Sequence, residues 1–191
     1  MKSEYLIKLS GICGIMLPIV TISGLLIALP RAPWFSWTEN AISDLGRPDF
    51  GLSFFNYTLI LVGILLLTFS FGLLYSSKGE RIGPTVLALS SIYFIGVGIF
   101  PLPDPNHVDV SGLFFIAFPL GFLMLGLKMY KKRSRFIKNM GISALIIAII
   151  GGGTPIFLLF YEGIAIPEVI ILFPGFFWCM TYGLHLVTSE K

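Results

Sequence analysis

The sequence predicts an all-α integral membrane protein with six transmembrane helices. Hydrophobic residues make up 55% of the 191-residue chain and charged residues only 12%, whereas a soluble domain has about 25% charged residues. Too little polar surface remains to cover a domain of this size in water, so the apolar surface must face lipid. The 21 Gly and 12 Pro residues exclude a coiled coil, and the high hydrophobicity excludes a disordered chain.

The transmembrane helices are predicted from six apolar runs that contain no charged residue except Glu168. Each run falls within the range of about 17–25 residues that crosses the hydrocarbon layer of a membrane as a helix. The runs cover residues 9–29, 52–74, 84–100, 110–127, 140–160 and 167–187. Because the connections are mostly short, we expect one six-helix domain over residues 1–191 and no separate soluble domain.

The first and fifth runs carry features that modify this simple prediction. The first follows Lys2 and Lys8, as a signal peptide would, but no small-x-small cleavage site precedes Pro30, so we expect it to remain as a span. The fifth contains three consecutive glycines at 151–153, followed closely by Pro155. We therefore expect that helix to bend or unwind locally.

The charges of the connections predict the orientation. With the N-terminus inside, every Lys and Arg falls on the inner side except Arg31 and Arg47, which is the positive-inside pattern. The same placement puts most acidic residues outside, namely Glu39, Asp44, Asp49, Asp104, Asp109, Glu162 and Glu168. We therefore expect both termini in the cytoplasm and the protein in the cell membrane.

A basic run at residues 128–138 lies in one of the inner connections. It has the charge of a nucleic-acid patch, but its position between two spans favours an anchor at anionic lipid headgroups. The sequence therefore predicts membrane lipids as partners and no nucleic acid.

The first outer connection, residues 30–51, contains signals for a short helix. Ser36 and Glu39 have the spacing of a capping box, and Gly46 with Pro48 beyond it is typical of a helix stop. These signals predict a short interfacial helix over residues 37–45, about 13 Å long.

The polar side chains of this predicted helix share one face. At about 100° per residue, Glu39, Asn40, Ser43 and Asp44 lie together, opposite an apolar arc that includes Trp37. One interpretation is a plain interfacial helix with a solvated polar face. The other is a ligand-binding surface between the helix and the ends of the spans, suited to hydroxyls, amines or a cation.

The second outer connection contains Asp104, His107 and Asp109. These residues are candidates for general acid and base roles or for binding a divalent metal. Alternatively, Asp104 is a turn residue and Asp109 a helix cap. A three-histidine zinc site cannot be built from the one outer histidine, and the two cysteines are interpreted as buried free thiols. The sequence predicts no metal site and no cofactor.

Residues 40–46 read Asn-Ala-Ile-Ser-Asp-Leu-Gly and follow a segment rich in Pro and aromatic residues after the first span. In this motif and in its six-span layout, nearly the whole chain resembles the membrane family called domain of unknown function 998. The neighbourhood of Phe100, Pro101 and His107 is also similar. The resemblance implies a small multi-pass protein of bacteria or archaea and directs attention to Ser43, Asp44 and Gly46. It implies no reaction.

Three classes of function fit these observations. The preferred one is a binding protein that holds a lipid headgroup, a small polar ligand or a partner at its outer face. The first alternative is a membrane-embedded enzyme acting on lipid or lipid-linked substrates. The second is a small transporter, which the nearly uncharged spans disfavour because ion-coupled transport usually needs an ionisable residue within the membrane. The sequence leaves the oligomeric state open.

Overall fold

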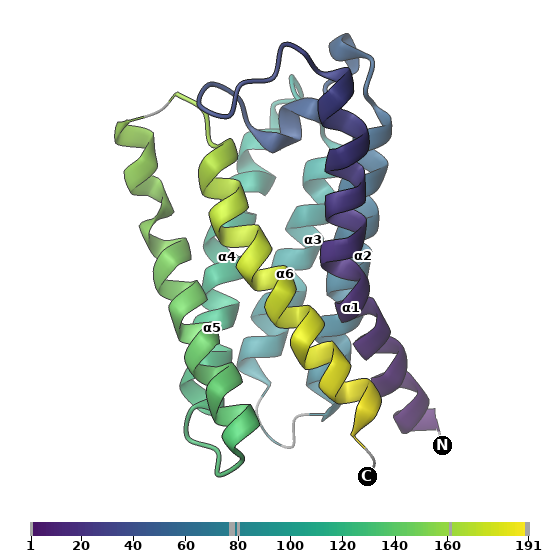
Figure 1. Cartoon of the computed structure of the whole chain (residues 1–191), viewed down its shortest axis with the longest axis vertical. Coiled ribbons are helices and arrows are strands. Elements are labelled where there is room, and N and C mark those ends of the chain that lie inside the picture. Colours follow the sequence, from purple (N-terminus) through teal and green to yellow (C-terminus); the bar gives the residue numbers. More distant parts are fainter. Residues whose placement is uncertain (1, 77–78, 80, 161, 190–191) are drawn as a thin grey trace.

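The computed structural model describes residues 2–76, 79, 81–160 and 162–189, and its regular elements in this part of the chain are all helical. The six long helices run side by side as a bundle (Figure 1). Their bounds are α1 Lys2–Ala28, α2 Phe54–Ser76, α3 Ile82–Ile99, α4 Asn106–Met129, α5 Arg135–Gly153 and α6 Ala165–Thr188. Short 3-10 helices occupy Leu29–Arg31 (η1), Ile42–Gly46 (η2), Pro48–Phe50 (η3) and Thr154–Leu159 (η4).

The predicted six-helix class is confirmed, since each helix is long and apolar enough to cross a membrane. Several helices begin before the predicted apolar runs. The first begins at Lys2 and the fifth at Arg135, because polar side chains in a terminal turn reach the headgroup layer while the backbone stays helical.

The predicted break in the fifth run is also confirmed. α5 ends at Gly153 and continues as η4. Pro155 has no N–H with which to bond the Gly151 carbonyl, as an α-helix would require. The Thr154 backbone N–H and hydroxyl donate to that carbonyl instead, the hydroxyl at 2.7 Å.

Each helix packs against its neighbours in the chain, and α1 also packs against α6, so the first and last spans lie side by side. This contact is close because both helices present glycine. A β-carbon at Gly11 would lie 2.7 Å from the Gly183 carbonyl oxygen, and one at Gly183 would lie 2.5 Å from the Gly11 oxygen. Such small residues let membrane helices approach, since van der Waals packing drives their association in lipid.

The centre of the bundle is filled with aromatic rings. Phe114, Phe118 and Phe122 follow one face of α4 and are fully buried. Phe94 of α3 lies 4.7 Å from Phe114, and Phe176 of α6 lies 6.0 Å from Phe118, measured between ring centroids. These separations are typical of favourable aromatic pairs, so the rings hold α3, α4 and α6 together.

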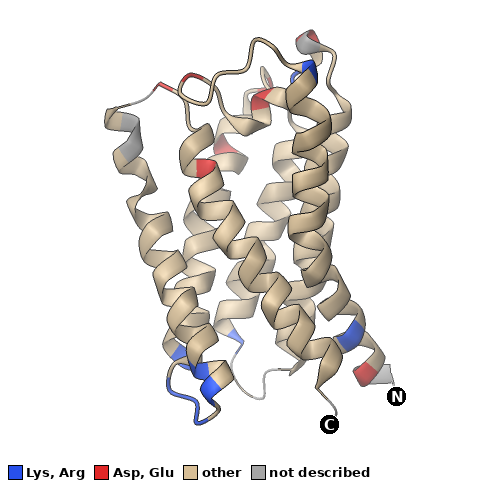
Figure 2. Ribbon diagram, viewed as in Figure 1, with Lys and Arg blue, Asp and Glu red and all other residues tan. Residues whose placement is uncertain are grey.

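The two ends of the bundle differ in charge (Figure 2). We call the end where α1 begins and α6 ends the basic end, because most Lys and Arg residues lie there, mainly around the α4–α5 connection. We call the opposite end the acidic end. It contains the α1–α2, α3–α4 and α5–α6 connections and most of the Asp and Glu residues.

The prediction of an interfacial α-helix over residues 37–45 is wrong. The chain there forms a turn at 37–39 and then η2, all five residues of which are buried. In an α-helix, the carbonyls of Thr38 and Asn40 would accept from residues 42 and 44. Instead Thr38 accepts from Gly163 at 2.8 Å, and Asn40 accepts from residues 164 and 165 at 3.1 and 2.9 Å. Bonds to the α5–α6 connection therefore replace the helical ones.

Candidate polar site at the acidic end

Hydrogen bonds to the Asp44 side chain and to a side chain of α6 stabilise the buried η2. The Asp44 carboxylate accepts a hydrogen bond from the Ala41 backbone N–H at 2.8 Å. The Glu168 carboxylate, in the first turn of α6, accepts from the Ile42 backbone N–H. These two bonds satisfy the donors that a helix start leaves without intrahelical partners.

Gly46 ends η2 where the sequence predicts a helix stop. The reason is close packing against α2, not a left-handed backbone, because the positive-φ glycines of the described residues are Gly51 and Gly79. Asn56 donates from Nδ2 to the Gly46 carbonyl at 2.7 Å, and a β-carbon at position 46 would overlap Asn56 Oδ1. In the described part of the chain, Asn56 Oδ1 is buried without a hydrogen-bond partner.

Ser43 and His107 connect η2 to the first turn of α4. Ser43 Oγ lies 3.1 Å from His107 Nε2, and His107 Nδ1 lies 2.7 Å from the Phe100 carbonyl oxygen. A carbonyl only accepts, so Nδ1 carries the hydrogen, and in the neutral ring Nε2 accepts from the Ser43 hydroxyl. Ser43 is 6% exposed and His107 4% exposed. The sequence singled out both residues but not their contact.

Glu168 is a site residue to which the sequence analysis gave no role. Its side chain is buried in the first turn of α6 and bonds to the backbone of η2. The sequence could have identified Glu168 by its position, because it is the one carboxylate within a predicted span. An ionisable residue at such a position is a default candidate for function.

The other predicted site residues lie elsewhere or have local roles. Glu39 is exposed, and the Asn40 side chain accepts from the Ser36 backbone N–H at 2.8 Å. Asp104 accepts from the backbone and side-chain nitrogens of Asn106 at 2.8 and 2.9 Å, as a turn residue does. Asp109 is exposed on the first turn of α4.

Arg47 and Asp49 form an ion pair outside the buried cluster, with 2.8 Å between Nη2 and Oδ2. The hydrogen bond from Arg47 lowers the pKa of the exposed Asp49 carboxyl, and the same bond raises the pKa of Arg47. Among the described residues, no three His, Cys, Asp or Glu side chains are grouped so that they could hold a metal ion.

Six apolar helices with a polar cluster at one end define a multi-pass integral membrane protein. A family model described as "Protein of unknown function (DUF998)" matches residues 15–185, and the chain belongs to this family. The resemblance seen in the motif at 40–46 is thereby confirmed. No curated protein and no solved structure gave a significant match.

Proposed function

We propose that the protein binds a lipid headgroup or a small polar ligand at its acidic end, which faces the outside of the cell membrane. The observation that carries this proposal is the set of buried polar side chains around η2. The carboxylates of Asp44 and Glu168 each accept one backbone hydrogen bond, and Asn56 Oδ1 accepts none within the described residues. Buried acceptors of this kind are costly unless a donor reaches them.

These acceptors favour a ligand that donates hydrogen bonds and carries positive charge, such as a primary amine. A nearby cation stabilises a buried carboxylate, whose charged form burial otherwise disfavours. Arg47 contributes some positive charge near Asp44 but makes its direct ion pair with Asp49. The placement of this end outside the cell rests on the positive-inside distribution of Lys and Arg.

Lipid binding by the purified protein tests this proposal. Native mass spectrometry would compare retention of phosphatidylethanolamine, whose amine donates hydrogen bonds, with phosphatidylcholine, whose quaternary amine cannot. We expect preferential retention of phosphatidylethanolamine, reduced by about tenfold in Glu168→Gln, because a charged hydrogen bond contributes about 1.5–3 kcal/mol. Glu39→Gln removes an exposed carboxylate from the same connection and should have no effect. Equal retention in both variants would overturn the proposal, provided that both unfold at the wild-type temperature.

A second function, an enzyme acting on lipid-linked substrates, is favoured by the contact between Ser43 and His107. A serine hydroxyl that donates to a histidine held by a second acceptor has the arrangement of a nucleophile and its base. A fluorophosphonate probe should then label Ser43 in the wild type, and labelling should be lost in Ser43→Ala and in His107→Gln. Absence of labelling in proteoliposomes would remove this alternative. The transporter alternative stays a prediction.

A further inference from the structure

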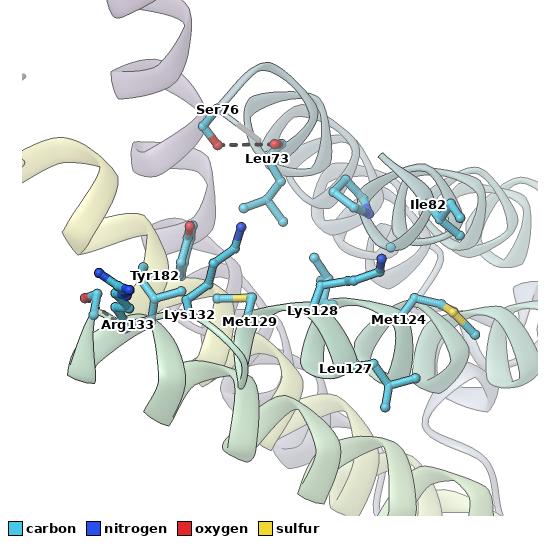
Figure 3. Close-up of a pocket in the computed structure, with 15 residues that line it drawn as sticks. Leu73, Ser76, Ile82, Met124, Leu127, Lys128, Met129, Lys132, Arg133 and Tyr182 are labelled. Atoms are coloured by element: carbon cyan, nitrogen blue, oxygen red, sulfur yellow. Dashed lines mark hydrogen bonds between the residues drawn. The ribbon is translucent and has the colours of Figure 1, made fainter. Parts of the chain in front are cut away.

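A cavity of about 870 Å³ lies at the basic end, the end away from the polar cluster (Figure 3). It is lined by the ends of α2 and α4, the starts of α3 and α5, and Tyr182 of α6. Its walls are mainly apolar and include Leu73, Ile82, Met124 and Met129. The volume lies within the range of about 300–1,000 Å³ that is usual for small-molecule sites, so part of an amphiphile can enter.

Three basic residues line the same cavity, namely Lys128, Lys132 and Arg133. Figure 3 shows Lys128, at the end of α4, and Lys132, in the α4–α5 connection, extending into the space across from Leu73 and Ile82, with Arg133 near Tyr182. Neither Lys132 nor Arg133 forms an ion pair with a carboxylate among the described residues. Lys132 and Arg133 carry like charges that repel each other, and a bound anion would relieve this repulsion.

The start of α5 adds to this positive charge. Ser134, which also lines the cavity, is the N-cap residue, and the first turn of α5 contains no acidic residue and begins with Arg135. A helix N-terminus carries partial positive charge and is normally complemented by negative charge. The cavity therefore combines apolar walls within spanning helices with a cationic rim.

We propose that this cavity binds an anionic membrane phospholipid, with an acyl chain among the apolar walls and the phosphate at Lys128, Lys132 and Arg133. Charge complementarity selects an anion, and the apolar walls select a lipid over free phosphate, which would leave them uncovered. Basic pockets between spanning helices at the cytoplasmic face are known to bind such headgroups. This site is separate from the acidic-end site and has the opposite charge preference.

Two charge-matched double variants test this proposal. Lys132→Gln with Arg133→Gln removes two positive charges from the cavity rim. Lys131→Gln with Lys138→Gln removes two from the same basic segment but outside the cavity lining. Each protein would be reconstituted into nanodiscs with equal amounts of phosphatidylglycerol and phosphatidylcholine, extracted gently, and examined by native mass spectrometry.

We expect the wild type and the Lys131→Gln, Lys138→Gln variant to retain phosphatidylglycerol. In the Lys132→Gln, Arg133→Gln variant the retained amount should fall about tenfold or more, because each basic contact strengthens anionic lipid binding severalfold. Equal loss of phosphatidylglycerol in both double variants would show that general surface charge causes the binding, and would overturn the proposal. Equal retention of phosphatidylcholine by the wild type would also overturn it, as would displacement of the lipid by millimolar inorganic phosphate.

A cavity-filling variant tests the acyl-chain half of the proposal without changing charge. Ile137 is half-buried and lines the cavity from α5. Ile137→Trp should reduce phosphatidylglycerol retention while the melting temperature in lipid-free detergent stays near that of the wild type. Unchanged retention in Ile137→Trp would show that the lipid binds only at the surface, which contradicts the proposal.

Discussion

The two ends of this bundle differ in whether their polar side chains are buried or exposed. At the acidic end, the α1–α2 connection bonds to the α5–α6 connection and to the starts of α4 and α6, and the side chains of Ser43, Asp44, His107 and Glu168 are buried there. At the basic end, Lys132 and Arg133 are exposed around a largely apolar cavity. Buried polar groups joined by hydrogen bonds thus mark one end, and exposed positive charges around an apolar cavity mark the other. The predictions below test whether this contrast is real and whether the ends are independent.

The largest effect is expected at Gly163, where the α5–α6 connection meets the first outer connection. A β-carbon at this position would overlap the backbone of Glu39 and Asn40, and backbone cannot move aside as a flexible side chain can. Gly163→Ala should therefore lower the free energy of unfolding by about 3 kcal/mol, the upper range for overpacking. Titration with sodium dodecyl sulfate in mixed micelles measures this change.

Gly152 provides the matched control for Gly163. A β-carbon there has open space, so Gly152→Ala should leave stability unchanged or raise it by up to about 1 kcal/mol through helix propensity. Gly163→Ala should also leave phosphatidylglycerol retention at the basic end intact. Loss of lipid at that end would show that the two ends are coupled, contrary to the comparison.

An intermediate effect is expected at the contact between Ser43 and His107. Ser43→Ala leaves the buried Nε2 of His107 without its donor and should cost about 1–3 kcal/mol of unfolding free energy. A double-mutant cycle with His107→Ala should give a coupling energy of about 1 kcal/mol, because the residues interact directly. Thr38→Ala, which removes an exposed hydroxyl of the same connection, should change stability by less than about 0.5 kcal/mol. Additive effects of the two alanines would exclude the contact.

The six spans could be predicted from the sequence because hydrophobicity and length decide where a helix crosses lipid. The conformation of residues 37–45 could not, because it depends on bonds from residues 163–165, more than a hundred positions away. Local capping signals at Ser36 and Glu39 are real preferences, but these tertiary hydrogen bonds outweigh them.

The candidate site shows the same division between local and tertiary information. Ser43, Asp44 and His107 were identifiable from residue type and position, because polar residues are rare in this chain. Their arrangement was not, because it depends on how α4 and α6 meet η2. Gly46 ends η2 as predicted, but the physical reason for a glycine there could not be predicted. It lies against the Asn56 side chain, and nothing within residues 40–48 reveals that contact.

The smallest effect is expected at the ion pair between Arg47 and Asp49, which lies at the exposed margin of the acidic end. Because the hydrogen bond from Arg47 lowers the pKa of folded Asp49 below that of the unfolded chain, the pair stabilises the fold above the unfolded pKa. This contribution is lost as the pH falls through the folded pKa. In Arg47→Gln, the Asp49 pKa followed by NMR should rise toward its usual value and become insensitive to salt. Stability should change little, because the Asp49 side chain is exposed and the pair is screened by solvent. A large loss of stability in Arg47→Gln would instead show that Arg47 helps to hold the buried cluster together. The acidic end would then depend on a charge at its margin as well as on its internal hydrogen bonds.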